Sequence, residues 1–278
     1  MNTNSSWLDE WITSTAWEMT PPPAYGAFHL TFTFFGIFLC ILLARLFRRA
    51  DDRQNKWILC GAGVFLMLTE VYKQLFYYFY MEEQAYNFGI FPFQLCSVPM
   101  YLCVIAPFLP AGRLRDGMYH FMTTVNLLGG FMAFIEPSGI THSYWTLTLH
   151  AYVWHMSLIF IGFYLIASGR GATTWQHYRS ACVTFLVLCC VAFAINCALW
   201  EVSGGDINMF FVGPRNSSLL VFKQISERFG WYISTLLYIP VVCLGAAIVF
   251  YPVHRYFSKR KGAATAKTAV KEPTPVGK

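Results

Sequence analysis

Apolar segments about twenty residues long alternate with short polar segments along most of this chain. A helix of that length crosses the roughly 30 Å hydrocarbon core of a bilayer. Seven such segments are predicted, over residues 25–47, 57–80, 90–109, 118–134, 146–167, 181–200 and 231–251. The pattern therefore predicts an all-α fold, a polytopic membrane bundle of seven transmembrane helices.

The composition points to the same class of protein. Hydrophobic residues make up 56% of the 278 residues and charged residues only 12%, and the mean hydropathy is +0.45. Soluble domains carry about 25% charged residues. The composition thus excludes a soluble globular domain.

The basic residues predict the orientation of the chain. Arg and Lys gather after the first, third, fifth and seventh apolar segments, whereas the first 24 residues hold Asp9, Glu10 and Glu18 and no basic residue. Lys and Arg accumulate on the cytoplasmic side of membrane proteins. We therefore expect the N-terminus outside and the C-terminus in the cytoplasm. The net charge of +6 then reflects topology, and no nucleic-acid partner is predicted.

Three regions follow from this pattern. Residues 1–24 form an extracytoplasmic head, residues 25–251 the seven-span domain in the lipid bilayer, and residues 252–278 a basic cytoplasmic tail. The tail is rich in Ala, Thr and Pro from Lys259 onward, a composition typical of disorder. No signal peptide is predicted. We expect an endomembrane location in a eukaryote and the plasma membrane in a bacterium; the sequence carries no signal for an oligomeric state.

The nine cysteines are irregularly spaced and form no CxxC pair. They indicate neither a disulfide framework nor a zinc site. We expect no metal and no cofactor.

The stretch Phe91–Cys103 differs from a simple spanning segment. It contains Pro92, Gln94, Cys96 and Pro99 within a few residues of one another. Irregular or polar backbone at membrane depth persists only where protein or water surrounds it. We therefore predict a buried site centred on Cys96.

Other polar residues are predicted in the same outer half of the membrane. Cys96 lies about 9 Å and His155 about 14 Å below the outer ends of their helices at 1.5 Å per residue. The remaining residues predicted in this half are Glu70, Lys73, Asn126, His150 and Asn196. His120 is the main exception, near the inner end of the fourth segment.

Each polar group also has a purely structural interpretation. Glu70 and Lys73 are one turn apart and can neutralise each other. Asn126, followed by Gly129 and Gly130, is typical of close helix packing in membranes. A cysteine in an apolar segment usually packs as a small hydrophobe.

A thiol and an imidazole on separate helices at similar depth also suffice for nucleophilic chemistry. The imidazole of His155 would accept the proton of Cys96, and the thiolate would attack an acyl carbonyl. Gln94 or Asn196 could donate to the developing oxyanion. Glu70 could orient the imidazole.

The chain also resembles a known family, the YwaF-like, transmembrane protein 164 family of integral membrane proteins, over residues 57–251. The residues that carry the resemblance are Glu70 and Lys73, Pro92-x-Gln94-Leu95-Cys96, Asn126-Leu-Leu-Gly129-Gly130, Glu136-Pro137, His155, Asn196, Asp206-x-Asn208-Met209-Phe210 and Pro214. The step of 59 residues from Cys96 to His155 is close to the Cys-to-His step of the animal members.

The resemblance implies an activity. In the animal members a Cys and a His are held to transfer acyl groups to lysophospholipids without coenzyme A, and the more distant androgen-induced gene 1 proteins are lipid ester hydrolases that use Thr. By this resemblance Cys96 is the nucleophile and His155 its base, with phospholipid and lysophospholipid as substrates. In the animal branch the Cys stands between Pro and His, whereas Leu95 and Ser97 flank Cys96 here.

The sequence therefore leaves several functions open. An acyltransferase and a lipid hydrolase would share one Cys–His site and differ only in the acceptor. A small-solute transporter lined by Glu70, Lys73 and His120 is a further alternative. A receptor or photoreceptor is disfavoured, since the third segment lacks Asp-Arg-Tyr and the seventh lacks both Asn-Pro-x-x-Tyr and a Lys for retinal.

Overall fold

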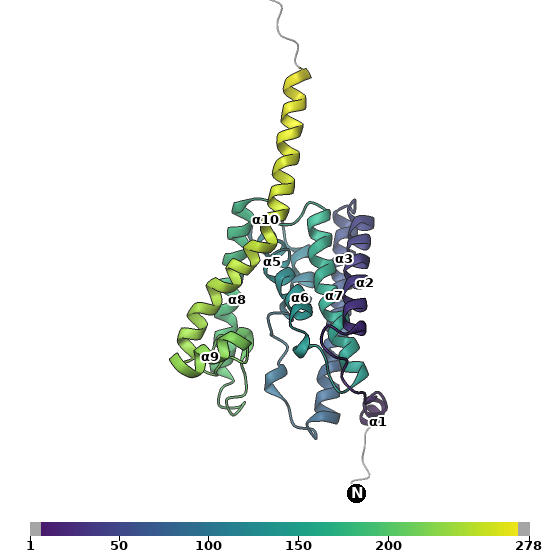
Figure 1. The fold of residues 1–278 in the computed structure, drawn as a ribbon, viewed down its shortest axis with the longest axis vertical. Coiled ribbons are helices and arrows are strands. Elements are labelled where there is room, and N and C mark those ends of the chain that lie inside the picture. The colour runs from purple at the N-terminus through teal and green to yellow at the C-terminus, as the bar shows by residue number, and fades with distance from the viewer. Residues whose placement is uncertain (1–6, 272–278) are drawn as a thin grey trace, which may run out of the picture.

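The computed structural model describes residues 7–271, with side chains to residue 260, and it is helical throughout (Figure 1). No β-strand occurs within these residues, where Glu18 and Tyr144 form one isolated bridge. The α-helices are α1 (Trp7–Ser14), α2 (Ala27–Phe47), α3 (Asp52–Phe76), α4 (Val98–Ile105), α5 (Arg113–Met122), α6 (Val125–Ile135), α7 (Trp145–Ala167), α8 (Trp175–Ala198), α9 (Leu220–Phe229) and α10 (Trp231–Lys271). Short helical turns are η1 (Tyr77–Met81), η2 (Phe88–Ile90), η3 (Ala106–Phe108), η4 (Pro137–Gly139) and η5 (Met209–Phe211).

Six of the predicted membrane segments are confirmed as helices. In the described part of the chain, six helical stretches are long and apolar enough to cross a membrane: Ala27–Phe47, Asp52–Met81, Arg113–Ile135, Trp145–Ala167, Trp175–Ala198 and Trp231–Arg260. The protein is therefore a multi-pass helical membrane protein.

The third predicted segment differs from the expectation of a seventh spanning helix. Its helical part is only Val98–Phe108, and residues 91–97 are not helical. Eleven helical residues rise about 16 Å, half the thickness of the hydrocarbon core. Pro92 lacks a backbone N–H, while Pro99 lies in the first turn of α4, where proline is tolerated. The prolines thus delay the helix until Val98.

The fourth predicted segment is divided into α5 and α6 by Thr123 and Thr124. The Thr124 hydroxyl donates to the carbonyl of His120 at 2.8 Å, and Thr124 has φ −126° and ψ −80°, outside the helical region. The Thr123 hydroxyl accepts a hydrogen bond from the Ala172 N–H at 3.0 Å. The break therefore fixes the α7–α8 connection against α5.

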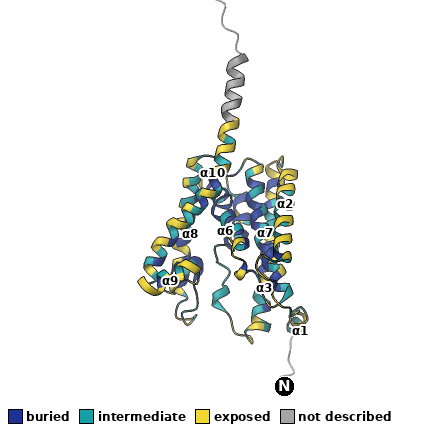
Figure 2. Ribbon diagram, viewed as in Figure 1, coloured by how far each residue is buried: buried dark blue, intermediate teal, exposed yellow. Residues whose placement is uncertain are grey.

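Helix α7 is the centre of the bundle. It packs against α2, α3 and α6, while α5 packs against α8 and α10 packs against α6 and α9. Its fully buried side chains include Tyr152, Leu158 and Tyr164. Buried residues fill the interior and exposed ones follow the outward sides of α2, α8 and α10 (Figure 2).

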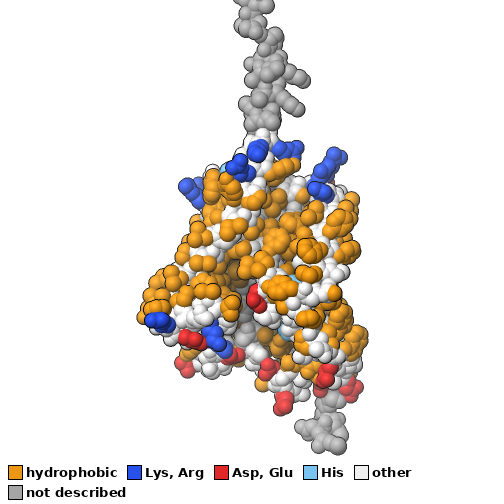
Figure 3. Space-filling view, in the orientation of Figure 1, with side chains coloured by type: hydrophobic (Ala, Val, Ile, Leu, Met, Phe, Trp, Pro, Cys, Tyr) orange, Lys and Arg blue, Asp and Glu red, His pale blue; other side chains and the backbone are white. Residues whose placement is uncertain are grey.

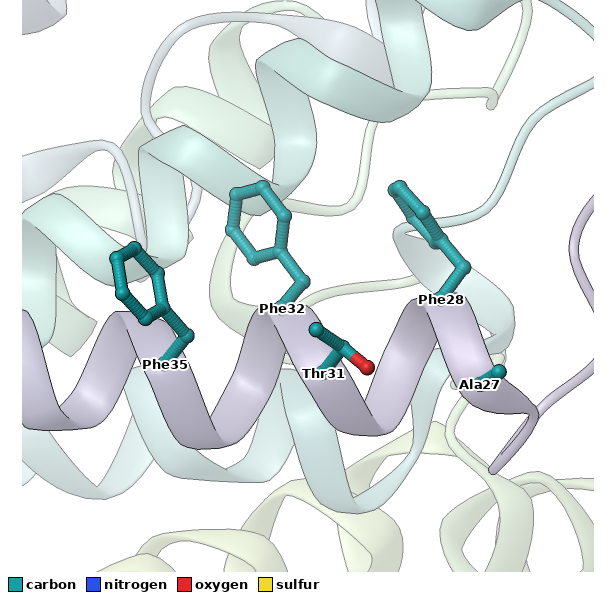
Figure 4. Close-up of a pocket in the computed structure, with 5 residues that line it drawn as sticks. All are labelled: Ala27, Phe28, Thr31, Phe32 and Phe35. Atoms are coloured by element: carbon teal, nitrogen blue, oxygen red, sulfur yellow. The ribbon is translucent and has the colours of Figure 1, made fainter.

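The exposed surface is largely apolar along the bundle. Helix α2 presents a shallow groove of about 420 Å³ from which the rings of Phe28, Phe32 and Phe35 project (Figure 4). Its lining is almost entirely apolar, as expected of a surface in contact with acyl chains.

The two ends of the chain lie at opposite ends of the molecule, with α1 at one and the end of α10 at the other (Figure 1). Helix α10 continues to Lys271, so the part of the tail up to that residue is helical where disorder was predicted from Lys259. The rest of the tail, 272–278, and residues 1–6 of the head lie outside the described residues.

Candidate functional site

Cys96 lies in the non-helical segment between η2 and α4, and its neighbours hold that segment in place. The Tyr101 hydroxyl donates to the Pro92 carbonyl at 2.8 Å, and the Gln94 side-chain amide donates to the Gly89 carbonyl at 2.9 Å. The indole N–H of Trp154, on α7, donates to the Cys96 carbonyl at 3.2 Å. Backbone groups that a helix would have paired are thus paired by side chains.

A charged group from α3 lies beside this segment. Glu70 is buried, and its Oε1 is 2.8 Å from the Lys73 ammonium. The Gln74 amide donates both to Glu70 Oε1 and to the Ile90 carbonyl, each at 2.7 Å. The predicted neutralising pair is confirmed, and Gln74 connects it to the start of the Cys96 segment.

The second carboxylate oxygen of Glu70 has no hydrogen-bond partner. The charges of both Lys73 and Glu70 act on the Cys96 thiol. The thiol is therefore exposed to the electrostatic field of a buried ion pair. One oxygen of that pair, Glu70 Oε2, remains able to accept a hydrogen bond.

His155 is held in one tautomer by its own helix. Its Nδ1 lies 2.8 Å from the Ala151 carbonyl. A carbonyl can only accept, so Nδ1 carries the hydrogen and Nε2 keeps a lone pair. The positive charge of Lys73 also acts on this imidazole. His155 thus presents an unprotonated Nε2, and the same ammonium acts electrostatically on it and on Cys96.

No contact joins the side chains of Cys96 and His155 among the described residues. Among the described side chains, the imidazole is bonded to Ala151, and the contact from α7 to Cys96 comes from Trp154, the residue before His155. Catalytic hydrogen bonds are often formed only when substrate is present.

Two further histidines surround Lys73. The His150 ring lies 5.5 Å from the Trp154 ring, and its Nε2 is buried without a partner. His142 lies in the loop before α7, where burial, and secondarily the charge of Lys73, lowers the pKa of its imidazole. The charge of Lys73 acts on both imidazoles, and only His150 was among the residues predicted for this region.

Asn126 has the structural role that its position suggested. Its amide donates to the carbonyls of Met122 at 3.2 Å and of Leu158, on α7, at 3.3 Å. At Gly130, a Cβ would meet Ile159 Cγ1 at 2.9 Å. Asn126 and Gly130 thus hold α6 closely against α7.

The side chain of Asn196 is fully hydrogen-bonded to the loop after α8. Its amide donates to the carbonyls of Met209 at 3.0 Å and Val212 at 2.7 Å, and its oxygen accepts from the Met209 N–H at 2.7 Å. Both amide hydrogens are used, so none is left for an oxyanion. The loop in turn reaches the Cys96 segment, because the Phe210 ring stacks on Phe93 at 5.7 Å.

His120 is not part of this region. Its ring stacks on His177 at 4.3 Å, beside Asn55 near the start of α3. Glu70 comes fifteen residues after Asn55 on the same helix, about 22 Å along its axis. Buried Leu59 and Leu66 lie between, and the predicted polar path is interrupted by apolar core.

Several neighbours of Cys96 could not be found from sequence. Trp154 is adjacent to His155 and Gln74 is one turn after Glu70, so both had a local signal. Tyr238 of α10, a buried residue on which Cys96 acts electrostatically, had none. Within the described residues no group of three or more His, Cys, Asp or Glu could hold a metal ion.

Comparison with known proteins decides the family. A model of the TMEM164 family matches residues 24–251, most of the chain. The chain belongs to the TMEM164 family. No curated protein and no solved structure matches it. The match covers the six long apolar helices as well as the short segment bearing Cys96, so this TMEM164-family protein shares the whole membrane domain with its family.

Proposed function

We propose that this TMEM164-family protein is a membrane acyltransferase that moves a fatty acyl group between phospholipids through Cys96 and His155. The observation that supports the proposal is that one ammonium, that of Lys73, acts electrostatically on both the Cys96 thiol and the His155 imidazole. Helix α3 supplies the ammonium, the unwound segment supplies the thiol and α7 supplies an imidazole with a free lone pair.

The first half-reaction forms a thioester. His155 Nε2 takes the proton of Cys96, and the thiolate attacks the ester carbonyl of a donor phospholipid. The ester C–O bond breaks while the C–S bond forms. The lysophospholipid leaves as an alcohol after taking the proton from the imidazolium.

The second half-reaction transfers the acyl group to the acceptor and restores the free thiol of Cys96. His155 removes the proton from the hydroxyl of an acceptor lysophospholipid, whose oxygen attacks the thioester carbonyl. The C–S bond breaks, and the thiolate regains the proton. Water in place of the acceptor gives a free fatty acid, so a lipid hydrolase is the alternative outcome of the same chemistry.

Lys73 is the group best suited to stabilise the thiolate and the oxyanion, while its positive charge opposes protonation of His155. Its ammonium has three hydrogens, of which one meets Glu70, and its charge acts on the thiol and the imidazole. A nearby cation favours thiolate over thiol, and at Cys96 it acts against the burial of the thiol and against the charge of Glu70. Both amide hydrogens of Asn196 are used in hydrogen bonds to the loop after α8. Lys73 is therefore the proposed donor to the oxyanion in place of Asn196.

The proposed orientation places this site in the outer leaflet. In this view Lys and Arg lie near the end where α10 leaves the bundle, and Asp and Glu lie near the other end, together with some further basic side chains (Figure 3). With the basic end in the cytoplasm, the chain would cross the membrane seven times, the short α4 and the extended segment before it making the third crossing.

The test is acyl transfer in membranes from expressing cells, with labelled phospholipid and added lysophospholipid. Cys96→Ala and His155→Ala should each abolish transfer while the protein accumulates normally. Cys197→Ala is the matched control, because Cys197 is an exposed thiol on α8. Full transfer by Cys96→Ala would refute the proposal. Release of free fatty acid regardless of acceptor would instead establish the hydrolase.

A further inference from the structure

A polar cavity lies at the opposite end of the bundle from Cys96. It has a volume of about 450 Å³ and lies between the first turns of α3, the helix α5, the α7–α8 connection and the start of α8. It is lined mainly by polar atoms, unlike the groove on α2. A polar cavity of this size on a bundle that is otherwise apolar requires a ligand or water to complete its hydrogen bonds.

Positively charged side chains outnumber negatively charged ones in the lining of the cavity. Three cationic side chains line it, Lys56, Arg115 and Arg170, against two carboxylates, Asp52 and Asp116. The Arg170 guanidinium is 2.8 Å from Asp52 and also donates to the Ala50 carbonyl at 3.2 Å, so it is largely satisfied within the protein.

The other two cationic side chains have fewer ion-pair and hydrogen-bond partners within the protein. Arg115 contacts Asp116 only through Nε, at 3.2 Å, which leaves its terminal nitrogens without an ion pair. The Lys56 ammonium lies over the Phe108 ring, 5.7 Å from its centre, and has no ion pair among the described residues. A planar guanidinium fork beside an ammonium is suited to an oxyanion.

A buried imidazole provides an independent indication. His120 lines the cavity and is only 7% exposed, yet its Nδ1 has no hydrogen-bond partner. Its ring stacks on His177 at 4.3 Å with an angle of 12° between the planes. Buried ring nitrogens are normally paired, so an unpaired one at a cavity wall marks a position where water or a ligand can accept or donate a hydrogen bond.

The chemistry of the lining narrows the class of ligand. A divalent metal is disfavoured, because no cluster of three or more His, Cys, Asp or Glu suited to a metal occurs in the described part of the chain. An organic cation is disfavoured by the excess of positive charge. An acyl chain is disfavoured by the polar lining. An anion with several acceptor oxygens fits the donors.

We propose that this cavity binds a phosphate-bearing anion, with the terminal nitrogens of Arg115 and the ammonium of Lys56 as its principal donors and His120 as a further contact. The volume exceeds that of inorganic phosphate and suits a phosphate with a small organic group. Such a group is present both in anionic phospholipid headgroups and in soluble phosphate esters, and the cavity lies where the bundle meets the aqueous phase.

The experiment separates these two sources. Full-length protein in detergent is titrated with glycerol 3-phosphate at constant ionic strength while thermal unfolding is followed. The same protein in nanodiscs of phosphatidylcholine, with and without phosphatidic acid, is analysed for unfolding and for lipid retained on extraction. Stabilisation by glycerol 3-phosphate assigns a soluble ester; stabilisation and retention only with phosphatidic acid assign a headgroup. No response to either overturns the proposal.

Variants test the residues. Arg115→Gln should weaken binding roughly tenfold or more, the loss expected for one charge-assisted hydrogen bond. Lys56→Gln, at an exposed side chain that the fold does not require, should weaken it similarly. Arg113→Gln is the matched control, because Arg113 is exposed on the same helix and does not line the cavity. Equal losses in Arg113→Gln and Arg115→Gln would show non-specific attraction and overturn the proposal.

The outcome does not depend on the Cys96 site. Cys96→Ala protein should bind the anion as wild type does, since the cavity lies at the other end of α3. Binding that disappears in Cys96→Ala would refute the claim of a separate site. Acyl transfer that fails while anion binding remains would count against the proposed enzyme alone.

Discussion

The ion pair of Glu70 and Lys73 permits a test that separates a structural role from a functional one. The two charged atoms are 2.8 Å apart, and the side chains are 5% and 20% exposed respectively. At an effective dielectric constant of about 20, unit charges at that distance attract by roughly 6 kcal/mol. Removing both from water costs a comparable amount, so the pair as a whole contributes little net stability.

The single variants should behave very differently from the pair. Glu70→Gln leaves the Lys73 ammonium without its carboxylate, and such a loss in a buried pair costs about 3–5 kcal/mol. Because Lys73 is 20% exposed and can regain some water, we expect about 3 kcal/mol, at the lower end of that range. Lys73→Met leaves the more deeply buried Glu70 unpaired and should cost at least as much.

The double variant decides the question. Glu70→Gln with Lys73→Met removes both charges while keeping similar volumes, and it should recover most of the stability lost by either change alone. Unfolding of purified protein in mixed micelles measures the four free energies of the cycle. A double variant no more stable than the worse single variant would refute the reasoning from the buried pair.

Acyl transfer then reports the functional role. If the ammonium supports the thiolate and the oxyanion, the double variant folds but turns over at least 100-fold more slowly, the loss typical of one oxyanion donor. A folded double variant with wild-type turnover would leave the pair a purely structural one. Lys73→Arg, which keeps the charge, is the control expected to retain part of the activity.

Three further tests address the packing of Asn196 and Gly130 and the acid sensitivity of His142. Asn196→Ala removes three hydrogen bonds to the loop after α8 and should cost about 3 kcal/mol of unfolding free energy by chemical denaturation; an unchanged stability with slow turnover would instead indicate an oxyanion donor. Gly130→Ala should cost about 1–3 kcal/mol, because its Cβ would meet Ile159 at 2.9 Å, whereas Gly129→Ala, with nothing within 4 Å, should be neutral. Burial lowers the pKa of His142, so the unfolded chain binds its proton more readily and stability should fall as pH drops below about 6.5. His142→Asn should reduce that fall in thermal unfolding measured between pH 5 and 7, and an identical pH profile would contradict it.

Much of the fold follows from the apolar pattern. Six of seven predicted segments are helices of spanning length, since about twenty apolar residues in a bilayer have no better way to pair their backbone groups. The exception is the third segment, where Pro92 and Pro99 signalled irregular backbone but the pattern could not show how little helix remained. The basic tail is likewise helical to Lys271, where composition alone indicated disorder.

The sequence indicated which residues to consider for the candidate site, but not the contacts that those residues make. Depth along each helix placed Glu70 and Lys73 near Cys96, and their charges do act on its thiol. Depth could not show that Asn196 is occupied by a loop, nor that His120 stacks on His177 at the other end of the bundle. These facts depend on how helices pair, which a linear sequence does not contain.

The irregular segment before α4 has a consequence for biogenesis. Two of its carbonyls and that of the preceding residue receive hydrogen bonds from side chains outside the segment: Pro92 from Tyr101, Cys96 from Trp154 and Ile90 from Gln74. Until α3, α4 and α7 have come together, those carbonyls lack their hydrogen-bond partners. Unpaired carbonyls are unfavourable in lipid, so this segment cannot take its final position in the membrane before α7 has been synthesised. Placement of Cys96 in its final position is therefore a late event in synthesis, and quality control of the unfinished protein would act on this segment first.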